Sequence, residues 1–150
     1  MSGPNVSQLF DLTGRTAIIT GGGGLLGRKH AEAVHECGGT PVLLDISADL
    51  GSAAAEAFGG KAFALALDIT DEAALSAARD VILKRTGRID ILINNAANNP
   101  KIEHDALDNP LSRLEELPLG SWNDDIAVGL TGAFLCSRIF GADMAKAGKG

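Results

Sequence analysis

The length, composition and charge of this chain set the first limits on what it can be. Its 150 residues are enough for one compact domain with a hydrophobic core, spanning residues 1–150, and too few for two. The 13 Lys and Arg residues against 19 Asp and Glu residues give a formal net charge of −6. This charge argues against nucleic acid or an anionic membrane as a partner, because both are bound by clustered basic side chains.

The sequence also carries little sign of export or of a metal site. Its N-terminus has no basic region followed by an apolar core, and no stretch approaches the length of a membrane span. The two cysteines, Cys37 and Cys136, lie in different expected helices without the spacing of metal ligands. These features predict a cytoplasmic protein with two reduced thiols, no membrane association and no metal.

The first expected elements are a strand, a glycine-rich turn and a helix. Residues 15–20 (Arg-Thr-Ala-Ile-Ile-Thr) form a β-branched, apolar run, which is typical of a strand buried on both faces of a parallel sheet. Four glycines follow, and then residues 28–37 carry apolar side chains at helical spacing before Gly38 and Gly39. Glycine at that point is a common helix stop.

The chain repeats this alternation up to residue 93. Further strands are expected at 41–45, 62–67 and 89–93, with one helix running from a Ser47 cap through Phe58 and another from Thr70-Asp71-Glu72 to about Thr86. Strands that alternate with helices through short turns predict right-handed βαβ crossovers and a parallel sheet.

The segment 94–120 breaks the alternation. It is rich in Asn and Pro and long for a connection inside a compact domain, which favours a functional or mobile loop. Leu111, Leu114 and Leu117 indicate one or two helical turns within it. A long helix is then expected from a Ser121 cap to the region of Lys149, with one apolar face made by Trp122, Ile126, Leu130 and Phe134.

The glycine-rich turn is the most informative motif. Gly22-x-Gly24-x-x-Gly27 matches the dinucleotide fingerprint, in which glycines make the turn, let the backbone approach a pyrophosphate and pack helix on strand. The anion would lie at the N-terminus of the following helix, where unpaired N–H groups and the helix dipole favour negative charge. Four consecutive glycines can also form a merely flexible loop, but the flanking strand and helix favour the nucleotide site.

Four motifs together resemble the short-chain dehydrogenase/reductase family over almost the whole chain. They are Thr20 to Gly27, Asp45, Asp68-Ile69 and Asn94-Asn95-Ala96-Ala97. The resemblance implies a Rossmann-type, doubly wound parallel sheet with helices on both faces. It also implies a nicotinamide cofactor bound by the early strands and turns, with catalysis carried by later ones.

The resemblance assigns individual roles to these residues. Asp45 would hydrogen-bond the adenosine ribose, which predicts NAD, because a carboxylate about 4 Å from a 2′-phosphate is repelled by about 4 kcal/mol per charge at an effective dielectric constant of 20. Asp68 would accept from the adenine amino group and Ile69 would pack on the ring, while Asn94 and Asn95 would tie the fourth strand to its neighbours and touch the ribose side. The implied cofactor-binding residues are Gly21, Gly23, Gly24, Leu25, Leu26, Asp45, Ile46, Asp68, Ile69, Asn95, Ala96 and Ala97.

Simpler structural roles exist for the same polar residues. Asp45 can help to cap the next helix, Asp68 is an ordinary turn residue before Thr70, and the asparagines suit turns.

Two positions depart from the family pattern. Leu25 stands where the single-domain branch has glycine, a spacing nearer to the extended branch of nucleotide-sugar epimerases and dehydratases, although the Asn-Asn-Ala motif favours the single-domain branch. Gly129 occupies the place of the catalytic asparagine. Since glycine inside a helix costs about 1 kcal/mol against alanine, Gly129 and Gly132 suggest close backbone packing, or a local bend with water replacing the side chain.

The catalytic serine and the Tyr-x-x-x-Lys pair of the family would lie beyond the long helix. The 150 residues contain no tyrosine, so no catalytic residue is assigned here and the chain alone is expected to bind cofactor without turnover. It resembles the N-terminal part of a longer domain, truncated after the fourth strand and the following helix.

The expected function is NAD-dependent hydride transfer with a small-molecule secondary alcohol or ketone, in a homodimer or homotetramer. The alternatives are a nucleotide-sugar epimerase or dehydratase and a non-catalytic NAD-binding module.

Overall fold

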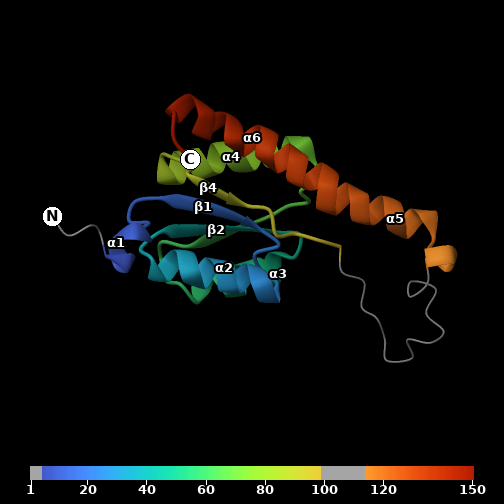
Figure 1. The fold of residues 1–150 in the computed structure, drawn as a ribbon, viewed down its shortest axis with the longest axis horizontal. Helices are drawn as coiled ribbons and strands as arrows, with labels where there is room; N and C mark the ends of the chain where they lie inside the picture. Colours follow the sequence, from blue (N-terminus) through green and yellow to red (C-terminus); the bar gives the residue numbers. More distant parts are fainter. Residues whose placement is uncertain (1–4, 99–113) are drawn as a thin grey trace.

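A parallel four-stranded sheet forms the centre of the protein (Figure 1). The structure is a computed structural model and describes residues 5–98 and 114–150. The strands lie in the order β3-β2-β1-β4, so the chain leaves β1 toward β2 on one side and reaches β4 on the other. Ligands of open α/β sheets bind at such a reversal, beyond the carboxyl ends of the strands. The strands are β1 (Thr16–Thr20), β2 (Thr40–Asp45), β3 (Phe63–Ala66) and β4 (Ile91–Ile93).

Helices cover both faces of this sheet, which confirms the expected doubly wound α/β fold. In Figure 1, α4 and α6 lie on one face, and α2 and α3 lie on the other. The helices are α1 (Val6–Leu9), α2 (Leu25–Glu36), α3 (Ala48–Glu56), α4 (Glu72–Thr86), α5 (Leu119–Ile126) and α6 (Ala133–Ala147), with a 3₁₀ turn η2 (Leu114–Glu116) and a π-helical segment η3 (Ala127–Gly132).

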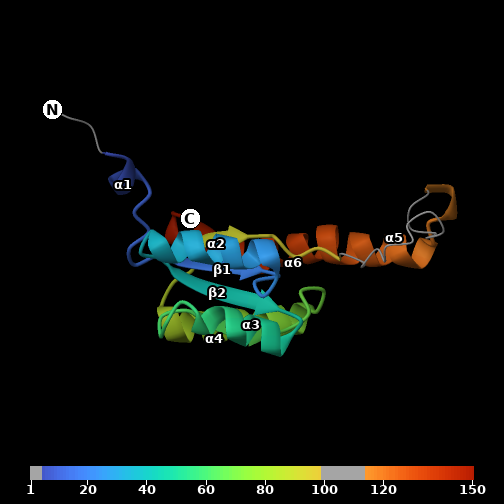
Figure 2. The ribbon, with the colours of Figure 1, turned by 90° about the horizontal axis from the view of Figure 1, so that it is seen from below.

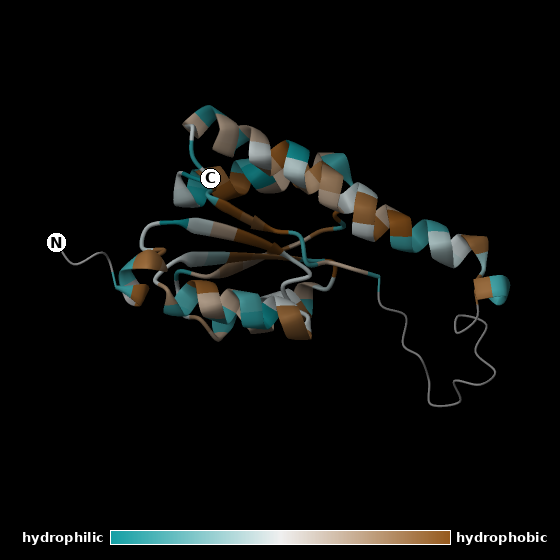
Figure 3. Ribbon diagram, viewed as in Figure 1, coloured by the Kyte–Doolittle hydropathy of each residue, from teal (hydrophilic) through white to brown (hydrophobic). Residues whose placement is uncertain are grey.

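Each face of the sheet has its own hydrophobic core. Neighbouring residues of a strand point to opposite faces, so Ile18 packs in the cluster beneath α4 and α6 while Ile19 packs in the cluster beneath α2 and α3. Both isoleucines are fully buried. The strands therefore contribute apolar side chains to both layers, as the continuous hydrophobic run of residues 15–20 predicts. Figure 3 colours the fold by the hydropathy of each residue.

Several expected helix boundaries are confirmed by hydrogen bonds. Ser47 caps α3, with its hydroxyl accepting from the Leu50 N–H at 3.4 Å. Asp71 caps α4 by accepting from the N–H groups of Ala73 and Ala74 at 2.9 and 3.0 Å. Gly87 ends α4 with φ of +76°, a conformation in which glycine avoids the steric cost of a Cβ.

Other boundaries differ from expectation. Helix α2 begins at Leu25 rather than at residue 28, because the extended backbone of Gly24 already serves as its N-cap. Helix α5 begins at Leu119 with Pro118 as N-cap, so Ser121 lies inside the first turn and the predicted Ser121 cap is wrong. A proline at a helix start loses nothing, because an N–H there has no intrahelical partner.

The remaining differences are shorter elements and one additional helix. Helix α3 ends at Glu56 rather than Phe58, and β3 and β4 are shorter than the expected 62–67 and 89–93. Helix α1 was not expected; it is stabilised by a reciprocal pair of side-chain caps between Asn5 and Gln8. Of the leucines thought to form turns in the long loop, Leu114 begins η2, whereas Leu111 lies outside the described residues.

The expected long helix is present, with an interruption. Residues 119–147 run as α5, η3 and α6, so six residues in the middle adopt the π-helical form. This run of 29 residues contains an 18-residue stretch with a mean hydropathy of 1.3, so by length and composition it could cross a membrane. The expectation that no stretch approaches that length was therefore wrong. The face that carries Leu135, Ile139 and Phe140 is buried against the sheet and α4, as in a core helix of an α/β domain.

The two cysteines differ in burial. Cys136 is fully buried in α6, and burial raises the pKa of its thiol to about 11. Cys37, at the end of α2, is partly exposed.

Helix α5 and strand β4 lie at the margins of the fold. Helix α5 projects beyond the sheet in both views (Figures 1 and 2). Strand β4 pairs with β1 through Ala17–Ile91, Ile18–Leu92 and Ile19–Ile93 and with no other described strand. The other edge of β4 has no partner strand among the described residues.

Candidate cofactor site

The glycine-rich turn is held in place by its own backbone hydrogen bonds. The N–H of Gly22 donates to the Leu44 carbonyl at 3.1 Å, and the N–H of Gly24 donates to the Gly21 carbonyl at 3.1 Å. Gly21 has φ of +63°, which glycine adopts without strain. The turn therefore leads from β1 to α2 in one defined path.

Two of these glycines allow the turn to pack against α2 and β2. A Cβ on Gly27 would lie 2.1 Å from the Gly21 carbonyl oxygen, and one on Gly22 would lie 2.5 Å from a methyl group of Leu43. The helix thus approaches the turn too closely for any side chain at residue 27, which is the packing role that the fingerprint assigns to its last glycine.

The N-terminus of α2 offers backbone donors to an anion. Its N-cap is Gly24, which has no side chain to accept from the N–H groups of the first turn. Leu25 and Leu26 occupy that first turn and are exposed. Such unpaired N–H groups, together with the helix dipole, suit a phosphate.

Asp45 ends β2 and faces the same turn. One of its carboxylate oxygens accepts from the Gly23 N–H at 2.8 Å and the other accepts from the Ser47 N–H at 2.9 Å. An ionised carboxylate has about four acceptor sites, so two backbone bonds fix its orientation and leave capacity for ribose hydroxyl groups. The contact with Ser47 also means that the simpler interpretation, support for the start of α3, is part of its role.

Two of the expected residues, Asp68 and Ile69, follow the end of β3. Asp68 accepts from both the N–H and the hydroxyl of Thr70 at 2.8 Å, so its carboxylate makes the expected turn contacts. Ile69 is 7% exposed and belongs to the core beneath α6. A Cβ on Gly132 would lie 2.6 Å from the Ile69 side chain, so Ile69 also supports the π-helical segment.

The Asn-Asn-Ala motif joins the end of β4 to the end of β1. The Asn95 side-chain amide donates to the carbonyls of Thr20 and Gly21 at 3.0 and 3.3 Å. The N–H groups of Asn95 and Ala96 both donate to the Thr20 hydroxyl at 3.0 Å. Asn94 instead points to α6, where it donates to the Ser137 hydroxyl at 3.1 Å. Each asparagine therefore ties β4 to a different neighbour.

A cavity of about 680 Å³ brings these residues together, within the usual range for small-molecule sites of about 300–1,000 Å³. Every expected cofactor-binding residue except Gly23 lines it. Its lining consists of Gly21, Gly24, Leu25, Leu26, Leu44, Asp45, Ile46, Leu50, Leu67, Asp68, Ile69, Asn95, Ala96, Ala97, Asn98 and Val128. Within the described residues this lining includes no Lys or Arg, so backbone N–H groups are the donors available to a phosphate.

Sequence reasoning missed two kinds of contributor to this site. Thr20 is 1% exposed and its hydroxyl organises the junction between β1 and β4, a role that a polar residue at the end of an apolar strand could have signalled. Asn98 and Val128 line the cavity from the β4 end. The Asn98 amide donates to the Asp125 carboxylate of α5 at 3.0 Å, a contact that no local pattern reveals.

The π-helical segment shows why glycine occurs at positions 129 and 132. Gly132 is buried and packs closely on Ile69, whereas a Cβ on Gly129 would meet no atom within 4 Å. Close packing therefore explains Gly132, and a local change of helix geometry accompanies Gly129. Short π-helical segments often occur at functional sites.

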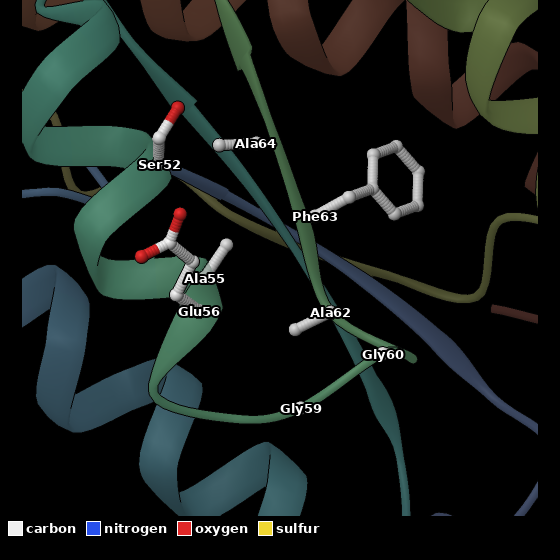
Figure 4. Close-up of a pocket in the computed structure, with 8 residues that line it drawn as sticks. All are labelled: Ser52, Ala55, Glu56, Gly59, Gly60, Ala62, Phe63 and Ala64. Atoms are coloured by element: carbon white, nitrogen blue, oxygen red, sulfur yellow. The ribbon is translucent and has the colours of Figure 1, made fainter.

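A second hollow, of about 440 Å³, lies between α3 and β3 and lacks the features of a cofactor site. Figure 4 shows Ala64 of β3 and Ala62, just before this strand, pointing toward α3, with Phe63 pointing to the other side. The polar side chains that line this hollow are Ser52 and Glu56. The larger cavity, at the carboxyl ends of the strands, is the candidate site, and no group of His, Cys, Asp and Glu in the described part of the chain could hold a metal ion.

The strand order, the glycine turn and the cavity at the carboxyl ends define a Rossmann-type nucleotide-binding protein. The family model described as short chain dehydrogenase matches residues 15–150. The chain belongs to this family of oxidoreductases, which bind a nicotinamide cofactor.

Individual relatives agree with this assignment. D-threitol dehydrogenase of Mycolicibacterium smegmatis is 33% identical over 144 residues, which cover 94% of this chain and 52% of that protein. NAD-dependent glycerol dehydrogenase of Listeria innocua is 33% identical over 141 residues, covering 94% and 52%. 7alpha-hydroxysteroid dehydrogenase of Escherichia coli is 31% identical over 147 residues, covering 96% and 53%.

These matches favour a dehydrogenase over the nucleotide-sugar epimerase alternative. The chain spans about half the length of these curated relatives.

Proposed function

We propose that this chain is the NAD-binding part of a dehydrogenase that oxidises a secondary alcohol or reduces a ketone. The observation that supports NAD is the Asp45 carboxylate, which lines the cavity and is oriented by the N–H groups of Gly23 and Ser47. A 2′-phosphate placed beside this charge would be repelled by several kcal/mol before screening by salt. The printed name of the Listeria relative, an NAD-dependent enzyme, supports the same choice.

Different residues of the cavity would contact different parts of the cofactor. The first turn of α2 would hold the pyrophosphate, Asp45 the adenosine ribose, and Ile46, Asp68 and Ile69 the adenine. Asn95, Ala96 and Ala97 would lie along the remaining part of the dinucleotide, toward Val128. When bound, the nicotinamide ring would donate or accept a hydride.

Substrate and turnover are further parts of the proposal. Small polyols are candidate substrates, since the relatives include enzymes named for threitol, glycerol and sorbitol. Turnover also requires an acid or base within hydrogen-bond reach of the substrate oxygen, and these 150 residues contain no tyrosine to supply the family's acid. We therefore expect NAD binding without turnover by this chain, with catalytic residues located in a further part of the protein.

Self-association and location complete the proposed function. The long helical run exposes five apolar residues, which are Leu119, Trp122 and Ile126 of α5, Leu130 of η3 and Phe134 of α6. Burying such a surface between copies would stabilise a homodimer or homotetramer. Sedimentation of the purified protein as a single monomeric species would contradict this. We propose a cytoplasmic location, in keeping with the small soluble substrates expected.

The discriminating experiment replaces Asp45 by Asn. Asn is close in shape to Asp and keeps one acceptor for the Gly23 N–H, but it removes the charge and weakens the contact with the ribose. We expect the unmodified chain to bind NAD at least about 100-fold more tightly than NADP, and Asp45→Asn to narrow this ratio to less than about tenfold. Isothermal titration with both dinucleotides measures the ratio.

The matched control is Asp49→Asn, which removes the same charge from an exposed position in the first turn of α3. It should leave the ratio unchanged. Equal affinity of the unmodified chain for NAD and NADP would refute the role of Asp45.

A further inference from the structure

We propose that Arg28 is a positioning residue that holds the four-glycine turn in the shape that binds the cofactor. The inference rests on the proposed function, because it assumes that this turn receives a dinucleotide. Arg28 lies in the first part of α2 and is exposed. Its side chain turns back toward the loop that precedes its own helix.

The contact of Arg28 is made with the centre of the turn. The Nε–H group of Arg28 donates to the Gly23 carbonyl at 2.9 Å. The other end of the same peptide group, the N–H of Gly24, donates to the Gly21 carbonyl at 3.1 Å. The peptide between Gly23 and Gly24 is therefore held at both ends, and Arg28 supplies a side chain for this purpose.

The same glycine connects Arg28 to the proposed ribose site. The N–H of Gly23 donates to Asp45 at 2.8 Å. A Cβ on Gly23 would lie 2.7 Å from the Leu50 Cβ and 3.0 Å from the Asp45 carboxylate. Gly23 is thus confined between Asp45 and Leu50 on one side and held by Arg28 on the other. A shift of Gly23 would therefore move both the pyrophosphate-binding turn and the hydrogen bond to the Asp45 carboxylate.

The composition of the turn explains why a tether matters. Glycine has more accessible backbone conformations than any other residue, and ordering it costs the most entropy. Residues 21–24 are four glycines in succession. A turn that is already ordered before the cofactor arrives avoids this cost at binding, and preorganisation of this kind increases affinity.

Arg28 does not stabilise the start of its own helix. A cation near a helix N-terminus opposes the helix dipole. The neighbouring Lys29 forms an ion pair, with its Nζ 2.6 Å from a Glu32 carboxylate oxygen. No carboxylate among the described residues lies within ion-pair distance of Arg28. The hydrogen bond to Gly23 is the contact that the side chain makes instead.

Three variants separate the hydrogen bond from the charge. Arg28→Met removes both. Arg28→Gln removes the charge but keeps an N–H donor at the same distance along the side chain, since the glutamine amide nitrogen follows the same number of bonds as the arginine Nε. Lys29→Met is the matched control, because it removes one positive charge from the adjacent residue of α2.

The first measurement is the affinity of the purified chain for NAD by titration calorimetry. We expect Arg28→Met to bind NAD about fivefold more weakly, the effect of one lost hydrogen bond of ordinary strength. Arg28→Gln and Lys29→Met should stay within about twofold of the unmodified chain. An Arg28→Gln variant as weak as Arg28→Met would overturn the tether, because charge alone would then explain the loss.

The second measurement needs no cofactor and keeps the two proposals distinguishable. Amide hydrogen exchange at Gly23 and Gly24, followed by NMR, should be faster in Arg28→Met than in the unmodified chain and unchanged in Lys29→Met and Arg28→Gln. Unchanged exchange in Arg28→Met would overturn the positioning role even if NAD binds. Failure of the unmodified chain to bind NAD would instead overturn the proposed function, and with it the role of Arg28 in cofactor affinity.

Discussion

Strands β1 and β4 are neighbours in the sheet and have similar apolar sequences, yet they differ in burial. All five residues of β1 are buried, whereas the three residues of β4 are each partly exposed. Strand β1 has β2 on one side and β4 on the other, while β4 pairs only with β1 among the described strands. The comparison shows that burial in a parallel sheet depends on which strands flank a segment as much as on its own residues.

Two glycines, Gly27 in the first turn of α2 after β1 and Gly129 near β4, differ in the same way. In the turn after β1, helix α2 and β2 approach so closely that side chains are excluded. In the π-helical segment near the β4 side, Gly129 is exposed beside open space. One set of glycines is required by packing, and the other position tolerates a side chain.

The largest expected effect tests this contrast between glycines. Gly27→Ala places a methyl group 2.1 Å from the Gly21 carbonyl oxygen, so backbone must move, and we expect a loss of about 3 kcal/mol in the free energy of unfolding. NAD affinity should fall more than tenfold, since the turn shifts with it. Gly129→Ala, in contrast, should raise stability by about 0.5–1 kcal/mol, as alanine is the better helix former.

Urea denaturation and NAD titration of both variants make the test. Equal destabilisation by Gly27→Ala and Gly129→Ala would break the comparison, because it would show that the two glycines are equally constrained.

A smaller difference in stability is expected between identical substitutions on a central strand and on β4. Leu43 of β2 is fully buried between its neighbours, and Leu92 of β4 packs on the core while remaining partly exposed. We expect Leu43→Ala to cost about 3–4 kcal/mol and Leu92→Ala about 1–2 kcal/mol, because the second removes less buried surface and leaves a smaller cavity. Urea denaturation measures the difference in unfolding free energy, provided that the dependence of this free energy on urea concentration is the same in both variants.

The Leu92 result can also sharpen the comparison. If a longer form of the protein adds a strand beside β4, the cost of Leu92→Ala should rise in that form toward the value for Leu43→Ala. A cost that is already equal in the present chain would indicate that β4 is covered by something else, such as a second copy.

A third expected effect concerns the point where β1 and β4 begin. Asp90 is 3% exposed, and its carboxylate accepts from the Thr16 N–H at 2.9 Å and from Arg88 Nε at 2.7 Å. Burial acts to raise the pKa of this carboxyl, but the bonds from Arg88 and Thr16 and the nearby positive charges outweigh it, so the pKa is lowered. We expect Asp90→Ala to cost about 2–3 kcal/mol at neutral pH.

The sign of the pH dependence follows from the lowered pKa. The contribution of Asp90 is fully present above the unfolded pKa of about 3.9 and is lost as the pH falls through the lower folded pKa. As the pH falls below about 4, the unfolding free energies of the unmodified chain and Asp90→Ala should therefore begin to approach each other, and they should meet below the folded pKa. Asp80→Ala, at an exposed position paired with Arg79 of the same helix, should show little effect at either pH, and a persistent gap in acid would contradict the assignment to Asp90.

Much of the fold could be predicted because its signals are local. The apolar run at 15–20 and the caps at Ser47, Asp71 and Gly87 act within a few residues, and the structure has them where expected. The Ser121 cap was wrong because two adequate helix starts lie close together, and Pro118 was used. The π-helical segment was foreseen only as a possible bend, since its form depends on contacts such as that of Gly132 with Ile69.

The sequence by itself determined the parallel α/β architecture, the glycine turn and the acidic residue at the end of β2, because each depends on periodicity, conformational freedom or charge over a short stretch. Only the tertiary structure decided that Thr20 joins β1 to β4, that Asn94 and Asn95 point to different neighbours, and that Arg28 reaches Gly23. These contacts join side chains to backbone groups or, for Asn94 and Ser137, to another side chain, and the packing of the elements fixes the positions of both partners. No pattern along the chain encodes such a distance, so it appears only when the sheet and helices are assembled.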